Sequence, residues 1–154
     1  MKRTTPTAAA SAPDFGILMP ITVYLDDLDL MGILHNSRYQ VLVERAWSAF
    51  WMGQGFGGKT GLEGDGFQVI KAFTITYEAP LTQPGECAVH LWMEHMGNTS
   101  ATAGYRVCSA DGDTTYAQGT RTFVRLDSTT LLPTPWSDRG REVARTIGVP
   151  QDRK

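Results

Sequence analysis

The helix predicted over residues 37–52 constrains the fold more than any other segment, because it is apolar on most of its faces. Polar side chains interrupt it mainly at Glu44, Arg45 and Ser48. A helix with so few polar positions is expected to be buried on nearly all sides. A small sheet buries such a helix only by curling around it.

Both ends of this helix carry recognisable signals. Ser37 followed by Gln40 matches a capping box at the start, and Gly53 is a natural cap at the end. The glycine-rich stretch over residues 53–66 includes Gly58-Lys59-Thr60. A nucleotide-binding loop needs this triplet after a strand and before a helix. Here the triplet follows a helix, so we interpret the stretch as a mobile loop beside an active site.

Alternating apolar and polar residues predict strands on both sides of the helix. They indicate one strand before it and four antiparallel strands after it, followed by a short helical run. The predicted strands cover residues 17–25, 68–77, 86–95, 99–109 and 114–126, and the helical run covers residues 137–147. The expected fold class is α+β, with a curved antiparallel sheet wrapped around one long central helix.

Length and composition favour a single domain. The chain has 154 residues, 42% of them hydrophobic, which is enough for one core. We expect a disordered leader over residues 1–16, the domain over residues 17–135 and a helix-like tail over residues 136–154. The net charge of -2 does not indicate the basic surface that nucleic-acid-binding proteins carry. No apolar run reaches the roughly 18 residues of a membrane span.

The two cysteines, Cys87 and Cys108, are too few for a disulfide framework. We interpret them as reduced, packed thiols and expect a cytoplasmic protein. A two-residue turn at Gly97-Asn98 would place the two cysteines opposite each other in a hairpin. A disulfide between them therefore stays an alternative.

Three carboxylates and a glycine lie directly ahead of the helix, at Asp26, Asp27, Asp29 and Gly32. A carboxylate acts as a base or nucleophile, and glycine allows a positive φ or a close approach of the backbone. Free N–H groups at a helix start stabilise developing negative charge. Together these groups suit the hydrolysis of an ester or thioester.

A longer pattern extends from this loop along the chain. It comprises Asp27-x-Asp29-x-x-Gly32, Tyr39, Glu44-Arg45-Ala46 on the helix and, later, Tyr77-Glu-Ala-Pro80. Over about residues 17–135 the chain resembles the hotdog-fold acyl-CoA thioesterases of the 4-hydroxybenzoyl-CoA thioesterase type. The resemblance implies a hotdog fold and hydrolysis of an acyl-CoA. It implies no cofactor, because CoA is part of the substrate.

The second aspartate of this motif is catalytic in the family, which assigns chemistry to Asp29 as nucleophile or as the base that activates water. The resemblance also places the thioester carbonyl against the backbone N–H near Asn36. Many relatives carry histidine at that position, whereas this chain has His35 one place earlier. His35 either lines the site or caps the helix. Gly32, His35 and Asn36 complete the predicted catalytic set.

Tyr39, Trp47 and Asp27 form the predicted substrate-binding set. We also expect Asp27 to bond backbone N–H groups of its own turn. The outer sheet face, which carries His90 or Trp92, is expected to seek a partner subunit. The predicted assembly is a homodimer, or a tetramer built as a dimer of dimers.

The remaining histidines and cations are less informative. His90 and His95 lie on opposite faces of one predicted strand and share no metal-ligand spacing, so we predict no metal site. The cations considered for the CoA phosphates are Lys71, Arg106, Arg121 and Arg125.

Two other functions stay open for this sequence. One is a hotdog protein that binds acyl-CoA or another acyl ligand without turnover. The other is a thioesterase that acts on acyl-carrier protein.

Overall fold

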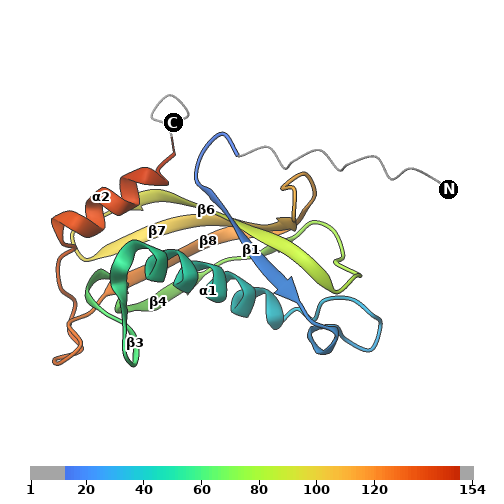
Figure 1. Ribbon diagram of the computed structural model, residues 1–154, viewed down its shortest axis with the longest axis horizontal. Coiled ribbons are helices and arrows are strands. Elements are labelled where there is room, and N and C mark those ends of the chain that lie inside the picture. Colours follow the sequence, from blue (N-terminus) through green and yellow to red (C-terminus); the bar gives the residue numbers. More distant parts are fainter. Residues whose placement is uncertain (1–12, 150–154) are drawn as a thin grey trace.

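The structure is a computed structural model that describes residues 13–149 and contains one large antiparallel sheet. The order across the sheet is β1-β6-β7-β8-β4, and β5 pairs with β8 (Figure 1). Its strands are β1 (Ile17–Val23), β4 (Gln68–Phe73), β5 (Thr76–Tyr77), β6 (Gly85–Met96), β7 (Ser100–Ser109) and β8 (Thr115–Arg125). Most of the predicted leader, residues 1–12, and the end of the predicted tail, residues 150–154, lie outside the described residues.

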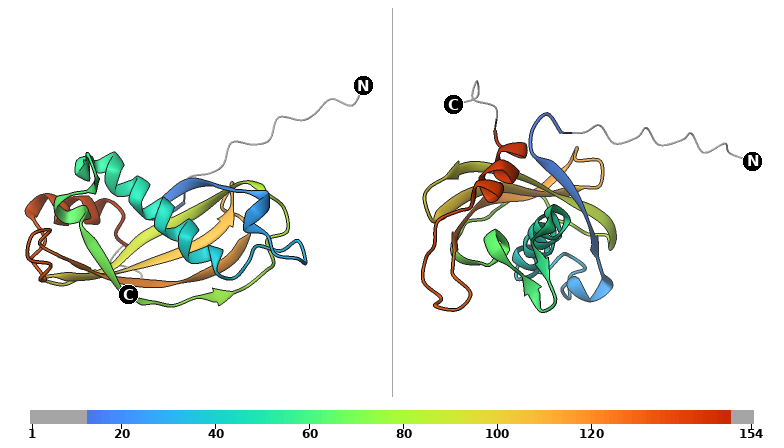
Figure 2. Two further views of the ribbon diagram at one scale, coloured as in Figure 1. Left: turned by 90° about the horizontal axis from the view of Figure 1, so that it is seen from below. Right: turned by 60° about the vertical axis from the view of Figure 1, so that its left-hand side comes forward.

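Two α-helices accompany the sheet. The helix α1 (Arg38–Trp51) lies within the curve of the sheet, and α2 (Asp138–Thr146) lies near the C-terminal end of α1 (Figure 2). None of the helices within residues 13–149 has the length and apolar character needed to cross a membrane. The smaller elements are the hairpin of β2 (Gly57–Gly58) and β3 (Gly61–Leu62), 3₁₀ turns at Leu25–Asp27 and Gly64–Gly66, and a π-helical turn at Met52–Phe56.

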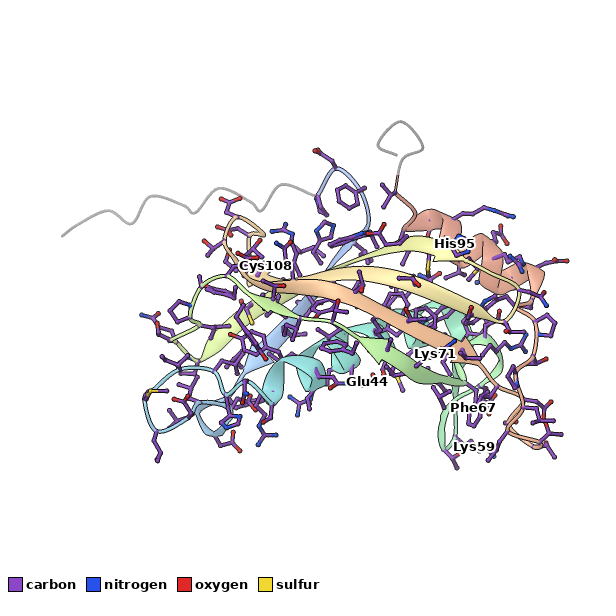
Figure 3. The ribbon with its side chains drawn as sticks, turned by 180° about the vertical axis from the view of Figure 1, so that it is seen from behind. Glu44, Lys59, Phe67, Lys71, His95 and Cys108 are labelled. Atoms are coloured by element: carbon purple, nitrogen blue, oxygen red, sulfur yellow. The ribbon has the colours of Figure 1, made fainter. Side chains whose placement is uncertain are left out.

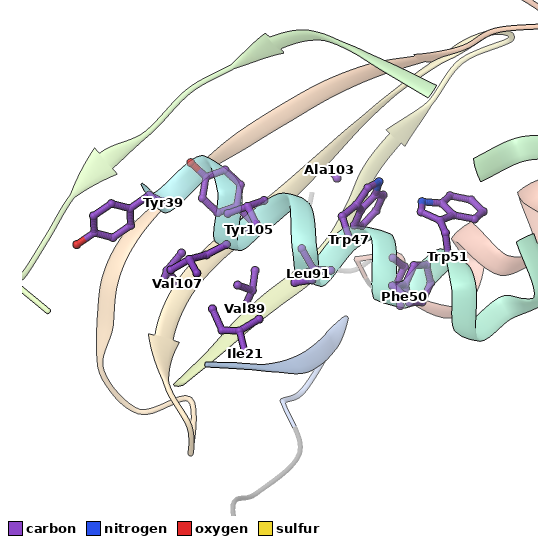
Figure 4. Close-up of a cluster of buried hydrophobic side chains, with 14 of the residues drawn as sticks. Ile21, Tyr39, Trp47, Phe50, Trp51, Val89, Leu91, Ala103, Tyr105 and Val107 are labelled. Atoms are coloured by element: carbon purple, nitrogen blue, oxygen red, sulfur yellow. The ribbon is translucent and has the colours of Figure 1, made fainter. Parts of the chain in front are cut away.

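The hydrophobic core forms between α1 and the concave face of the sheet. Tyr39, Trp47 and Phe50 on α1 are buried there (Figure 4). They face alternate residues of the central strands, such as Val89 and Leu91 on β6. Alternate residues of a strand share one face, so the sheet contributes a continuous apolar surface to the helix. The predicted α+β class and the curved sheet around a central helix are confirmed.

One face of α1 is exposed in the single chain. Val41, Arg45 and Ala49, which follow one another at helical spacing, are all exposed. Glu44 lies beside them and forms an ion pair of 2.5 Å with the buried Arg121 of β8. The expectation that the helix is buried on nearly all sides is therefore wrong for one chain. Glu44 supplies the counterion that a buried arginine requires.

Both ends of α1 differ from the prediction. Ser37 makes no side-chain cap, because its hydroxyl bonds Nδ1 of His35 at 2.8 Å instead of a backbone N–H of the helix. The predicted capping box is therefore wrong. At the other end α1 continues into the π-helical turn, and the positive φ of 93° belongs to Gly55 rather than Gly53. Gly55 ends the helical region because glycine adopts this conformation without a side-chain clash.

The segment predicted as a single strand over residues 68–77 forms two strands, β4 and β5. The register shifts between Ile70 and Ala72, and such a bulge bends and twists the strand. Between the two strands, the Thr74 N–H donates to the Thr120 carbonyl at 2.9 Å. The Thr74 carbonyl accepts a hydrogen bond of 2.6 Å from the Tyr105 hydroxyl. These bonds satisfy the backbone where the ladder is interrupted.

The two cysteines do not face each other. Cys87 pairs with Ser109, and Cys108 pairs with Ala88. The turn lies at Asn98-Thr99 instead of the predicted Gly97-Asn98, which offsets the pairing by two residues, and the register shift between Met93 and His95 restores only one of them. A shift of one residue places the two thiols on opposite faces of the sheet. Both are buried and free, so the disulfide alternative is wrong.

The helix α2 and the residues after it close one end of the core. The ring of Trp136 lies 5.7 Å from that of Phe123, measured between centroids. The Met93 N–H donates to the Ile147 carbonyl at 2.9 Å, and Gly148 forms a parallel bridge to Met93. The C-terminal segment therefore covers the edge of β6 at Met93, beyond Leu91, the last residue that pairs with β1. The predicted helical run is confirmed as α2.

The convex face of the sheet is partly covered by residues 13–16. The ring of Phe15 lies 5.1 Å from His90 and 5.4 Å from Trp92. His90 is buried, with Nδ1 accepting from Nε of Arg106 at 2.9 Å and Nε2 lying 2.7 Å from the Phe15 carbonyl. Because Nδ1 accepts, Nε2 carries the proton and donates to Phe15. The face expected to meet a partner subunit is thus occupied in part by the chain itself.

The free energy of unfolding is expected to decrease in mild acid because of His90. Burial lowers the pKa of His90 most, the Phe15 bond raises it, and the Arg106 guanidinium lowers it further. The unfolded chain, with a histidine pKa of about 6.5, therefore binds this proton more tightly than the folded protein. The stability is fully present above about pH 6.5 and is lost as the pH falls through the lowered pKa.

Thermal melts between about pH 7.5 and pH 5 measure this effect. The variant His90→Gln has no imidazole to titrate and is expected to give a flatter dependence. The exposed His95 provides the matched control, since His95→Gln is expected to retain the wild-type dependence. A wild-type slope in His90→Gln contradicts the assignment.

Candidate active site

The loop between β1 and α1 gives its three aspartates different surroundings. Asp26 is exposed, Asp27 is buried and Asp29 is partly buried. The loop begins with the 3₁₀ turn Leu25–Asp27 and is closed by an isolated bridge between Leu28 and Leu34.

Asp27 holds the loop against the start of α1. Asp27 is 4% exposed, and its carboxylate accepts a hydrogen bond of 2.8 Å from the Tyr24 N–H. Nε of Arg38 lies 3.5 Å from the other carboxylate oxygen, and the Asp27 carbonyl accepts from the His35 N–H at 3.0 Å. These contacts agree with the turn-stabilising role expected for Asp27.

Asp29 has one carboxylate oxygen engaged and one available. Oδ1 accepts hydrogen bonds from the N–H groups of Met31 at 2.8 Å and Ile33 at 3.2 Å. Among residues 13–149, no group donates a hydrogen bond to Oδ2. The bonds to Oδ1 stabilise the turn and fix the direction of the carboxylate. Oδ2 therefore stays available to a bound molecule.

Gly32 is needed for the backbone conformation of this turn. Its φ is 75°, a value that residues with a Cβ rarely adopt. Its N–H donates to the Asp29 carbonyl at 3.0 Å. A Cβ built at Gly32 would have no neighbour within 4 Å, so the single chain contains no close approach at this position.

His35 caps the residues that lead into α1. Its Nδ1 accepts from the Ser37 N–H at 3.1 Å, which leaves the ring proton of the neutral imidazole on Nε2. His35 also lines the depression that contains Asp29. His35 therefore both bonds the start of the helix and shares a depression with Asp29, and its part in catalysis stays a prediction. The neighbouring Asn36 N–H donates no hydrogen bond within the part of the chain that the structure describes.

Two depressions flank this helix start. One, of about 420 Å³, is lined by Asp29, His35 and three apolar residues of the loop. The other, of about 310 Å³, is lined by Asn36, Tyr39 and Tyr77 among others. A larger cavity of about 670 Å³ lies along β1 and touches none of the predicted site residues. The chemistry of the loop, rather than cavity size, therefore indicates the site.

The two aromatic residues of the predicted substrate-binding set occupy different places. Tyr39 is 3% exposed and borders the depression of Asn36, and burial raises the pKa of its phenol. Trp47 is 2% exposed and lies two turns farther along α1, about 12 Å from Tyr39 by helical rise. The Trp47 Nε1–H donates to Oε1 of Gln68 at 3.3 Å. Trp47 borders neither depression, and its role as a substrate contact stays a prediction.

Tyr77 borders the depression of Asn36, although the predicted site residues did not include it. It lies on β5, and its ring packs edge-on against Tyr39 at 5.2 Å between centroids. Its hydroxyl donates to the Asn36 carbonyl over 3.4 Å. Its place in the Tyr77-Glu-Ala-Pro80 segment of the family pattern was the available signal.

The three arginines considered for the CoA phosphates have protein partners. Burial lowers the pKa of Arg121, and its partner Glu44 raises it. Arg125 lies 3.4 Å from Asp65, and Arg106 donates to His90 on the convex face. Lys71 is exposed on β4 at the sheet edge (Figure 3). The part of the chain from residue 13 to 149 contains no cluster of metal-ligating side chains.

Comparisons with known proteins identify relatives of this arrangement. The family model of the thioesterase superfamily matches residues 31–116. No curated protein matches the chain.

Solved structures share the fold over most of the chain. A Thermus thermophilus thioesterase complexed with coenzyme A and Zn is 22% identical, with a TM-score of 0.71 and coverage of 86% of this chain and 94% of that one. A Xanthomonas campestris protein provisionally assigned as an acyl-CoA thioesterase is 29% identical, with a TM-score of 0.64 and coverage of 80% and 100%. The DHNA-CoA thioesterase of Staphylococcus aureus is 17% identical, with a TM-score of 0.64 and coverage of 77% and 78%.

Proposed function

Because the chain belongs to the thioesterase superfamily, we propose that it hydrolyses acyl-CoA thioesters to a free acid and CoA. The observation that carries this proposal is the setting of Asp29. Backbone N–H groups hold its Oδ1, and its Oδ2, beside the start of α1, receives no hydrogen bond from residues 13–149. The relatives that bind or act on CoA compounds support CoA as the carrier.

In the proposed reaction the thioester carbonyl oxygen accepts a hydrogen bond from the Asn36 N–H. This donor lies at the positive end of the helix dipole, so it stabilises the negative charge that develops on the oxygen. Oδ2 of Asp29 either attacks the carbonyl carbon or removes a proton from a water molecule that attacks it. The C–S bond then breaks, and CoA leaves as a thiolate that takes up a proton.

Water completes both routes. In the nucleophilic route, water hydrolyses the mixed anhydride that joins the acyl group to Asp29. In the general-base route, the water oxygen enters the acid directly, and Asp29 later releases the proton. The chain's own residues supply the carboxylate and the N–H donor, and the proposal includes no metal or cofactor.

We further propose that the protein acts in the cytoplasm as a homodimer, with a dimer of dimers as the alternative. The exposed face of α1 and the edge of β4, which pairs with no further strand within residues 13–149, support an interface on the concave side of the sheet. Val69 on β4 is 45% exposed, and Val41 on α1 is 37% exposed. Apolar residues exposed at a sheet edge and on a helix are features of surfaces that bind another chain.

Release of free CoA thiol from a panel of short, long and aromatic acyl-CoA substrates tests the activity. A thiol-reactive dye suits this protein because its own cysteines are buried, and burial raises the pKa of Cys87 to about 11. The proposal predicts dye signal from at least one substrate. Tight acyl-CoA binding by calorimetry without thiol release would instead support a binding protein. Hydrolysis of acyl groups carried on acyl-carrier protein, without hydrolysis of any acyl-CoA, would show that CoA is not the carrier.

A further inference from the structure

We infer that Tyr77 is a positioning residue, whose hydroxyl orients the backbone at Asn36 for catalysis. The inference rests on the proposed function and adds a residue to it. Tyr77 lies on β5, far from the acidic loop in the sequence, and meets that loop only through the fold. Its hydroxyl reaches the Asn36 carbonyl oxygen over 3.4 Å.

The peptide group between Asn36 and Ser37 is held from both sides. Its carbonyl faces the Tyr77 hydroxyl, and its N–H donates to Nδ1 of His35 at 3.1 Å. The preceding peptide group is held by the His35 carbonyl, which accepts from the Arg38 N–H at 2.9 Å. In a trans peptide the N–H points opposite to the carbonyl, so this bond sets the direction of the Asn36 N–H. Together these contacts restrain the two peptide groups that meet at Asn36.

Tyr77 is itself firmly placed. Its backbone pairs with Ala117 of β8, and the next two N–H groups, of Glu78 and Ala79, donate to the Tyr116 carbonyl at 2.8 and 3.1 Å. The side chain is nevertheless 50% exposed, so its hydroxyl borders the depression of Asn36 instead of filling the core. A hydroxyl in this position contributes little to folding. It can keep a donor aligned before the substrate arrives, which is the condition for efficient oxyanion stabilisation.

The test compares Tyr77→Phe with the wild type on an acyl-CoA that the wild type hydrolyses. The change removes the hydroxyl and keeps the ring that packs on Tyr39. We expect kcat to fall about tenfold while KM stays within about twofold, because the donor is misaligned in the transition state. The melting temperature is expected to change by no more than about 1 °C.

Tyr105→Phe is the matched control. This change also removes a tyrosine hydroxyl that donates to a backbone carbonyl, in this case the Thr74 carbonyl at 2.6 Å. Tyr105, unlike Tyr77, is buried. This variant is expected to melt about 2–6 °C lower and to keep its kcat.

Three results would overturn the inference or its premise, and they are distinguishable. An active wild type with an unchanged kcat in Tyr77→Phe refutes the role of Tyr77 alone. A parallel loss of kcat, substrate affinity and melting temperature assigns Tyr77 to folding. A wild type that releases no thiol from any substrate refutes the proposed function, and the positioning role with it.

Discussion

The variant Asp29→Asn is expected to hydrolyse acyl-CoA with a kcat/KM at least about 100-fold below that of the wild type. The amide has no negative charge, so it is neither a nucleophile nor a base for water. Its oxygen can still accept the hydrogen bonds that Oδ1 receives from Met31 and Ile33. The turn therefore keeps its shape, and the loss reports on chemistry.

The neighbouring Asp26 provides the matched control for this experiment. It is exposed and lies in the same loop, so Asp26→Asn removes the same charge without touching the turn of Asp29. Its kcat/KM is expected to stay within about twofold of the wild type. Steady-state thiol release measures both variants. If Asp29→Asn also stays within this range, the carboxylate of Asp29 is not the reacting group.

Replacing Asp65 by alanine is expected to lower the free energy of unfolding by about 3–5 kcal/mol. Asp65 is 2% exposed and accepts hydrogen bonds from the Ser137 N–H at 2.9 Å and the Ser137 hydroxyl at 2.7 Å. Nη1 of Arg125 lies 3.4 Å from its Oδ1. The alanine variant leaves an arginine without its counterion and a serine without its acceptor, and unpaired buried groups are costly.

Chemical denaturation at a fixed protein concentration measures the loss. Asp138→Ala is the control, because Asp138 is exposed in the first turn of α2 and makes no ion pair within residues 13–149. Its removal is expected to cost no more than about 1 kcal/mol, the usual effect of an acidic residue near a helix start. Equal losses in the two variants would show that Asp65 does not anchor α2.

The sequence predicted the order of the elements because their periodicities are strong and local. The apolar faces of α1 and of the central strands are set by side-chain spacing, which also determines what each element buries. The separate roles of Asp27 and Asp29 followed from turn chemistry and from the family pattern. The structure agrees with the turn role of Asp27, and the catalytic role of Asp29 stays a prediction.

The structure differs from the sequence predictions where local signals do not determine which contacts form. The sequence predicts Ser37 as the cap of α1, but the Ser37 hydroxyl bonds Nδ1 of His35 instead. Residue propensities do not include such a bond between two neighbouring side chains. The pairing of Cys87 with Cys108 failed because the turn lies one residue later than predicted and the bulge in β6 compensates only in part. The net offset of one residue reverses which side chains face each other. Tyr77 joins the site through β5, a contact that depends on tertiary structure alone.

The two edge strands of the sheet, β1 and β4, differ in how well they could pair with a second copy of this protein. On one side, β1 contains Pro20, which has no N–H to donate, and Gly148 bridges to β6 at Met93, beyond the residues that pair with β1. The edge formed by β4 is therefore the one suited to pairing with a second chain. If two β4 edges pair antiparallel about a two-fold axis, each edge is occupied by the other, so pairing at this edge would stop at two copies instead of continuing into a fibre.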